Sequence, residues 1–104
     1  MAPGIGQALL EDIVYQPEDG QLLSGSLMDY ALPRADDLPA IDVVLAGTPT
    51  ASNALGVKGS GQAGAIAASQ TVMNAIADAL SLMGAKVPDM PATPEKLGRA
   101  LRGA

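Results

Sequence analysis

The sequence contains no cysteine and no histidine, and its only aromatic residues are Tyr15 and Tyr30. Without cysteine, the chain has no disulfide, no iron–sulfur cluster held by its own thiolates and no thiol nucleophile. Without histidine, it lacks the commonest metal ligand and the commonest general base. We therefore expect no metal site and no catalytic triad built from the side chains of this chain.

Positive charge is also scarce. Lys and Arg number 6 against 11 for Asp and Glu, which gives a formal net charge of -5. The basic residues are scattered, whereas nucleic-acid binding requires clustered positive charge. No apolar run approaches the roughly 20 residues that a bilayer core requires, and the N-terminus lacks the pattern of a signal peptide. We expect no nucleic-acid partner, no membrane association and a cytoplasmic location.

The chain of 104 residues is long enough for one domain, and we expect residues 1–104 to form a single one. Hydrophobic residues make up 48% of it, but none is Phe or Trp. Alanine contributes little apolar area, so an isolated domain of this composition would be only marginally stable. The composition therefore favours a chain that is stabilised by packing against the surface of a partner.

The first half of the sequence has the pattern of short strands. Residues 6–15 begin with helix formers and end in a β-branched and aromatic run, which predicts a helix that leads into a strand. Residues 13–15 and 22–23 flank a turn sequence with Pro17 and Gly20, which predicts a β-hairpin. The second strand would continue to residue 32, and residues 41–45 would form a third. Together these segments predict a small antiparallel β-sheet.

The second half has the pattern of helices. Apolar residues recur at steps of three and four between Ile66 and Met83, and Gly84 is a typical stop signal. Thr93 followed by Pro94 is typical of the start of a further helix. The predicted fold is therefore α+β: a small antiparallel β-sheet followed by a Gly-rich loop, one long helix and one short C-terminal helix.

The Gly-rich segment between residues 56 and 64 leads directly into the predicted long helix. Its backbone N–H groups, together with the helix N-terminus and Lys58, are suited to an anionic group. The segment matches neither the P-loop nor the dinucleotide-binding pattern. A loop that only changes the direction of the chain explains the glycines equally well. The residues alone therefore leave both interpretations open.

Four motifs occur in a fixed order: residues 4–11 (GIGQALLE), 26–33 (SLMDYALP), 53–64 (NALGVKGSGQAG) and 74–80 (NAIADAL). In this order and spacing the chain resembles the C-terminal end of the molybdopterin-binding large subunit of the xanthine dehydrogenase, aldehyde oxidase and carbon monoxide dehydrogenase family. The resemblance extends over residues 4–101 and is far more specific than any one motif.

The resemblance implies a molybdenum hydroxylase that oxidises a carbon centre with oxygen from water. The cofactor would be molybdopterin, often the cytosine dinucleotide form in bacteria. The family's Gly-rich loop lies against the cofactor, which makes Gly56, Lys58, Gly59 and Gly61 candidate cofactor-binding residues. Gln7, in the first motif, is a further candidate, although a solvated helix residue is nearly as good an interpretation. The implied partners are the remainder of the molybdenum-binding subunit and, through it, subunits with Fe–S clusters and FAD.

One position departs from the family pattern. The family motif ends in Gly-Glu, and that glutamate acts as the catalytic base, whereas this sequence has Gln62 there. An amide does not accept a proton at working pH, and loss of a positioned base typically costs about 10²- to 10⁴-fold in rate. Either the parent protein is a weak or non-hydroxylating relative, or another residue acts as the base, or the glutamine was introduced.

Three hypotheses follow. The first is a C-terminal fragment of a molybdenum-binding domain that contributes the cofactor loop and is inactive as this chain alone. The second is a non-catalytic interaction or remnant module, with self-association as one form of it. The third is an independent phosphate- or nucleotide-binding module that uses residues 56–64.

Overall fold

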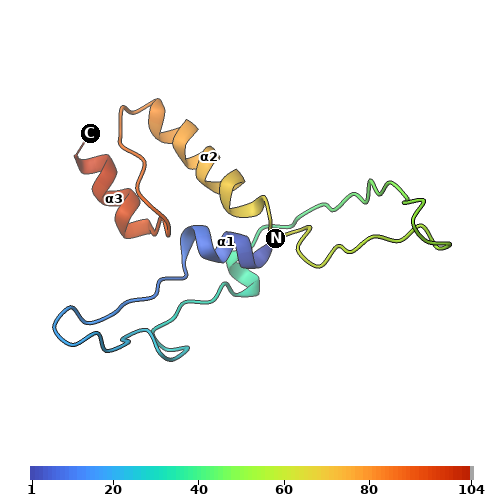
Figure 1. Ribbon diagram of the computed structural model, residues 1–104. Coiled ribbons are helices and arrows are strands. Elements are labelled where there is room, and N and C mark those ends of the chain that lie inside the picture. The colour runs from blue at the N-terminus through green and yellow to red at the C-terminus, as the bar shows by residue number, and fades with distance from the viewer. Residues whose placement is uncertain (104) are drawn as a thin grey trace.

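The computed structural model describes residues 1–103 and has three α-helices and one short 3₁₀ helix in that range. They are α1 (Ala2–Leu9), η1 (Ala35–Asp37), α2 (Ala68–Ser81) and α3 (Pro94–Arg102). Figure 1 shows α1 at the centre with α2 beside it, and two long loops that lead away in different directions. We call residues 10–34 the first arm and residues 38–63 the second arm.

The contact between α1 and α2 depends on small residues. A side chain at Gly4 would place its Cβ 2.6 Å from the Cβ of Ala68 and 3.1 Å from the carbonyl oxygen of Ala65. Glycine therefore permits an approach that even alanine would obstruct. Ser69 of α2 is buried at this contact, and its hydroxyl donates a hydrogen bond of 2.8 Å to the carbonyl oxygen of Gly4.

The segment before α3 closes the other side of α1. The backbone N–H of Ala92 donates to the carbonyl oxygen of Ala8 at 2.6 Å, and both residues are fully buried. An ion pair of 3.7 Å between Lys96 and Asp12 links α3 to the start of the first arm. The buried hydrophobic residues within 1–103 are few and small: Ala8, Leu80, Ala85 and Ala92. The core of the described residues is therefore small.

The predicted long helix and the predicted start of the C-terminal helix are confirmed, whereas the first helix spans Ala2–Leu9 and not the predicted stretch within residues 6–15 that leads into a strand. α2 ends at Ser81, and Gly84 follows with a positive φ of 66°, a conformation that glycine adopts without a steric penalty. Thr93 is the N-cap of α3, because its side chain accepts a hydrogen bond from the backbone N–H of Lys96. Pro94 occupies the first turn of that helix, where its missing N–H has no cost.

The predicted antiparallel β-sheet is wrong. Within residues 1–103 there is no strand, and the first arm has only one isolated antiparallel bridge, between Tyr15 and Leu22. The predicted turn does form, with the N–H of Gly20 bonded to the carbonyl of Gln16 at 2.9 Å. A lone hairpin is marginal in water unless a further strand or a helix covers it, and here nothing does. The fold of the described residues is therefore helical with long irregular arms, and not α+β.

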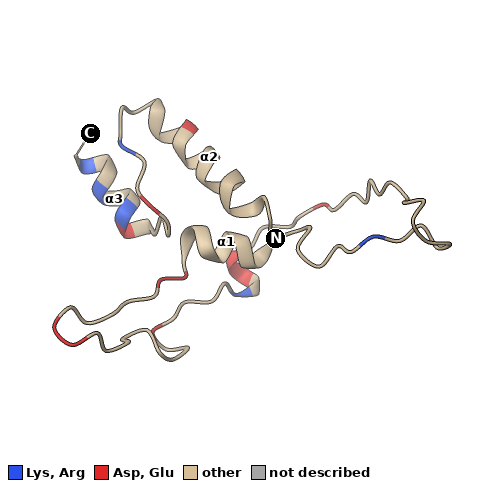
Figure 2. Ribbon diagram, in the orientation of Figure 1, with Lys and Arg blue, Asp and Glu red and all other residues tan. Residues whose placement is uncertain are grey.

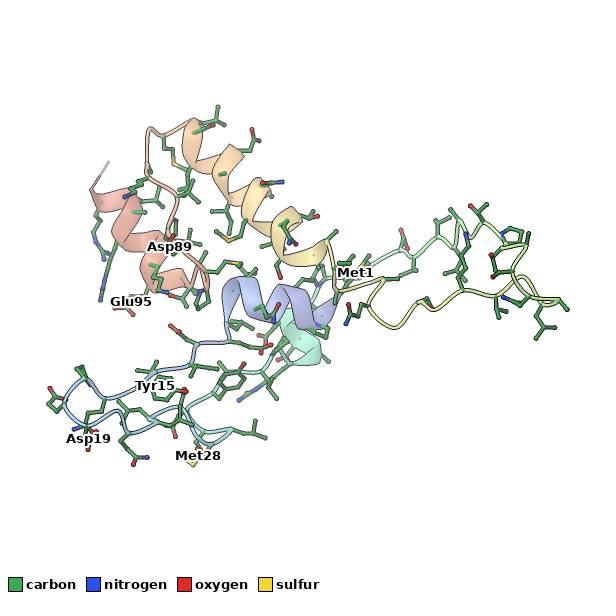
Figure 3. All side chains as sticks on the ribbon, viewed as in Figure 1. Met1, Tyr15, Asp19, Met28, Asp89 and Glu95 are labelled. Carbon is green, nitrogen blue, oxygen red and sulfur yellow. The ribbon has the colours of Figure 1, made fainter. Side chains whose placement is uncertain are left out.

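The arms make the molecule open. It measures 55 × 39 × 25 Å, and its radius of gyration of 17.9 Å exceeds the about 13 Å of a compact domain of this length. Figure 3 shows Tyr15, Asp19 and Met28 on the first arm, away from the helices. Many large apolar side chains stand exposed, and Met28, at 95%, is the extreme case. Such exposure is typical of a surface that another polypeptide covers.

Charge is distributed unevenly over these elements. Figure 2 shows blue segments gathered on α3, where Lys96, Arg99 and Arg102 lie, whereas the tip of the first arm carries only red. At the base of that arm the Tyr30 hydroxyl donates to the carboxylate of Glu11. This hydrogen bond, with a smaller effect of desolvation, raises the pKa of Tyr30. No helix among residues 1–103 has the length and apolar character needed to cross a bilayer.

Substitution of Gly4 tests the α1–α2 contact. We expect Gly4→Ala to lower the stability of the chain by about 1–3 kcal/mol, because the added methyl group overpacks against Ala68. Gly98→Ala is the matched control, since its Cβ would meet only the end of Arg102 at 3.9 Å, inside a helix that alanine favours by about 1 kcal/mol. Thermal unfolding followed by circular dichroism measures both, and equal effects of the two substitutions would contradict the packing argument.

Candidate functional site

A single asparagine shapes the turn that begins the Gly-rich segment. The side-chain oxygen of Asn53 accepts hydrogen bonds from the N–H groups of Leu55 and Val57, both at 3.1 Å. Its side-chain nitrogen donates to the carbonyl oxygen of Val57 at 2.9 Å. Gly56 has a positive φ of 65°, which this tight turn requires and glycine supplies. The turn at 53–57 therefore has a fixed shape before the chain continues to Lys58.

Two of the predicted site residues meet at this turn. Gly56 and Lys58 line a shallow hollow of about 390 Å³, together with Gly47, Thr48, Pro49 and Ser60. A Cβ at Gly56 would lie 3.0 Å from the Cβ of Pro49, so the two sides of the second arm approach closely here. Among residues 1–103 no carboxylate lies within ion-pair distance of Lys58. Its ammonium group therefore remains available to an anion.

The backbone after the turn presents a run of free donors. Within the described part of the chain, the N–H groups of residues 58–62 donate to no protein atom. Gly59 and Gly61 have open space where a Cβ would be. Successive free backbone N–H groups beside a cation are a suitable donor set for a phosphate-bearing cofactor such as molybdopterin. The loop is open and does not by itself enclose a ligand.

Gln62 and Gln7 lie at a second hollow, of about 380 Å³, whose other lining residues are Ala65, Ile66, Ser69 and Gln70. The backbone carbonyl of Gln62 accepts from the N–H groups of Ala65 and Ile66, both at 3.0 Å, and so begins the turns that lead into α2. The side chain of Gln62 is exposed and has no hydrogen-bond partner within residues 1–103. It is free to bond to a ligand.

The predicted site residues therefore fall into two groups. Gly56 and Lys58 belong to the hollow on the second arm, and Gln62 and Gln7 belong to the hollow between α1 and the start of α2. No residue lines both hollows, and Gly59 and Gly61 line neither. Gln7 and Gln62 are far apart in the sequence, and they line the same hollow because α1 packs against the start of α2.

Sequence reasoning missed Ser69 as a site residue. Its hydroxyl, besides bonding to Gly4, lies 3.5 Å from the side-chain oxygen of Gln7. The signal was present, because Ser69 is a polar residue on the otherwise apolar face of a helix. Asn53 was likewise assigned no role, although an asparagine three residues before a glycine is typical of a turn.

The chemistry available at the two hollows is binding and hydrogen bonding. Neither lining includes Asp or Glu, so neither hollow has a carboxylate that accepts a proton at neutral pH. The amide of Gln62 both donates and accepts hydrogen bonds. Across residues 1–103 no three His, Cys, Asp or Glu side chains gather in a way that suits a metal ion.

Comparison with known proteins gives consistent matches. The model of the molybdopterin cofactor-binding domain matches residues 1–39. The large subunit of nicotine 6-hydroxylase from Paenarthrobacter nicotinovorans is 42% identical over 100 residues, which are 96% of this chain and 12% of that protein. The carbon monoxide dehydrogenase large chain of Hydrogenophaga pseudoflava is 31% identical over 83 residues, or 80% of this chain and 10% of that protein.

The fold has a match among solved structures. The crystal structure of quinoline 2-oxidoreductase from Pseudomonas putida 86 superposes with a TM-score of 0.83 at 35% identity, and the match covers 97% of this chain but 13% of that one. The chain likewise spans only 12% of the length of the first curated relatives. Sequence and fold agree over nearly all of the chain, and this confirms the resemblance. The chain belongs to the family of molybdopterin-binding large subunits found in xanthine dehydrogenase, aldehyde oxidoreductase and carbon monoxide dehydrogenase.

Proposed function

We propose that this chain is the C-terminal part of the molybdenum-binding subunit of a hydroxylase, in which residues 56–62 form one wall of the cofactor site. The observation that carries this proposal is the run of unpaired N–H groups at residues 58–62, which includes Lys58 and lies a few residues before α2. Residues 58–62 are all exposed, so their N–H groups are accessible to a bound ligand. Residues 1–104 then belong to one larger molybdenum-binding domain.

In this proposal each group of residues has a separate task. The backbone N–H groups of Lys58, Gly59 and Gly61 hold phosphate oxygens of the cofactor, and the Lys58 ammonium neutralises part of their charge. The bound molybdopterin supplies the redox chemistry that oxidises a carbon centre with oxygen from water. Gln62 stands where the family has its glutamate base, and its amide orients an oxygen atom by hydrogen bonding without taking its proton.

The remaining parts of the enzyme lie outside this chain. The matched relatives include a large subunit and a subunit of a dehydrogenase complex. This supports assembly with the remainder of the molybdenum-binding subunit and, through it, with subunits that carry Fe–S clusters and FAD. We further propose the cytosine dinucleotide form of the cofactor and a cytoplasmic location for the assembled enzyme.

The role of Gln62 is tested by restoring a carboxylate. We expect Gln62→Glu to raise kcat of the assembled enzyme by about 10²- to 10⁴-fold, because it supplies a positioned base. Gln70→Glu is the matched control: Gln70 is exposed, lines the same hollow and gains the same charge. The measurement is steady-state turnover at several pH values with the molybdenum content of each variant held equal.

If Gln62→Glu and Gln70→Glu leave turnover unchanged or raise it equally, position 62 is not the base position. Gln62 also favours a second candidate function, a non-hydroxylating relative that binds the cofactor. If the protein is such a relative, Gln62→Glu produces no turnover. The cofactor content of Gln62→Glu and of Gln70→Glu then remains normal.

The role of Lys58 in holding the cofactor has its own test. We expect Lys58→Ala to weaken retention of the cofactor about tenfold or more, because a charge-assisted contact to phosphate is lost. Lys86→Ala removes an equally exposed lysine outside both hollows and serves as the control. Molybdenum and pterin are quantified in the purified protein after extensive dialysis. Equal loss from the two variants would contradict a cofactor role for Lys58.

A further inference from the structure

Residues 40–48 of the second arm have an unpaired backbone. Across this stretch of the described chain, no N–H or carbonyl group takes part in a hydrogen bond with another protein group. Pro39 and Pro49 flank the stretch, and Leu38 leads into it with extended backbone angles, φ -110° and ψ 134°. Figure 1 shows this part of the arm running out into open space.

The side chains of the same stretch are apolar and exposed. Val43, Val44 and Leu45 are 68%, 86% and 93% exposed. Ile41, Val43 and Val44 are β-branched and favour strands. In an extended segment Ile41, Val43 and Leu45 point to one face, whereas Val44 shares the other face with the carboxylate of Asp42. This pattern is typical of a strand whose apolar face is covered and whose other face stays partly in contact with water.

Burial of these side chains has a consequence for the backbone. A buried N–H or carbonyl group without a hydrogen-bond partner costs about 1–3 kcal/mol, so a surface that covers residues 40–48 must also bond to their backbone. Residues 1–103 provide no such partner, because they form no sheet. An extended segment pairs the groups along one of its two edges most simply by adding to the edge of another sheet, and water or a further strand then satisfies the groups along its other edge.

The occupant of this surface follows from the comparison with solved structures. The superposition on quinoline 2-oxidoreductase covers 97% of this chain, so it includes the course of the second arm, yet it covers only 13% of that chain. The same open arm thus occurs inside a much longer polypeptide. We propose that residues 40–48 add as a β-strand to a sheet of the remaining polypeptide of the molybdenum-binding subunit. This inference rests on the proposed function, and it identifies the surface that the assembly uses.

The test compares proline and alanine at Val43 and Val44 in the native assembly. Proline keeps apolar bulk but removes the N–H, whereas alanine keeps the N–H and removes apolar bulk. Adjacent N–H groups of a strand point to opposite edges, so at least one proline variant loses a pairing donor. We expect that Val43→Pro or Val44→Pro lowers the thermal midpoint of the assembly at least about 2 °C more than the alanine variant at the same position. The helices remain intact in the chain alone, because residues 40–48 form no bonds to them.

Hydrogen exchange of the unmodified protein gives an independent readout. The amides of residues 40–48 that face the added sheet, about every second one, should exchange at least about a hundredfold more slowly in the native assembly than in the chain alone. Fast exchange in the intact assembly, or alanine effects that equal or exceed the proline effects at both positions, would overturn strand addition and leave the proposed function standing. If the chain is recovered without the remainder of a molybdenum-binding subunit, the proposed function fails, and this inference fails with it.

Discussion

The packing of α1 against α2 through Gly4 is the contact on which the rest of the structure depends. It brings Ala65 and Ala68 close to the α1 backbone and buries the bond from Ser69 to the Gly4 carbonyl. The start of α2 is thereby fixed beside α1, and Gln62 comes to the same hollow as Gln7. One position without a side chain thus determines where two polar side chains meet.

The second constraint is the small size of the core. Its buried hydrophobic residues within 1–103 are three alanines and one leucine, whereas the arms expose many large apolar side chains. Such a chain buries too little apolar surface to hold long arms in place by its own contacts. The arms nevertheless follow the course seen in a solved enzyme whose chain is several times longer. Their shape is therefore suited to contacts with surrounding polypeptide.

Local signals predicted α2 and α3, whereas the predicted sheet depended on pairing between distant segments and does not form among residues 1–103. The apolar periodicity from Ile66, the stop at Gly84 and the cap at Thr93 act within a few residues, so the sequence alone identifies them. Residues 41–45 have the composition of a strand, but no segment among residues 1–103 pairs with them, and strand propensity expresses packing against neighbours. The candidate residues came from a resemblance, while the proximity of Gln7 to Gln62 needed the helix contact. Sequence reasoning also overlooked Ser69, because a single polar residue on an apolar face has many explanations.

The central claim is that this chain works as one wall of a molybdenum cofactor site within a larger subunit. The most direct measurement is the native mass of the tagged chain recovered from its source cells, with molybdenum and pterin quantified in the same peak. The account predicts a species much larger than the 10.4 kDa of this chain that carries molybdenum and the cofactor. A lone chain or a self-associated form, free of metal and pterin, would contradict it.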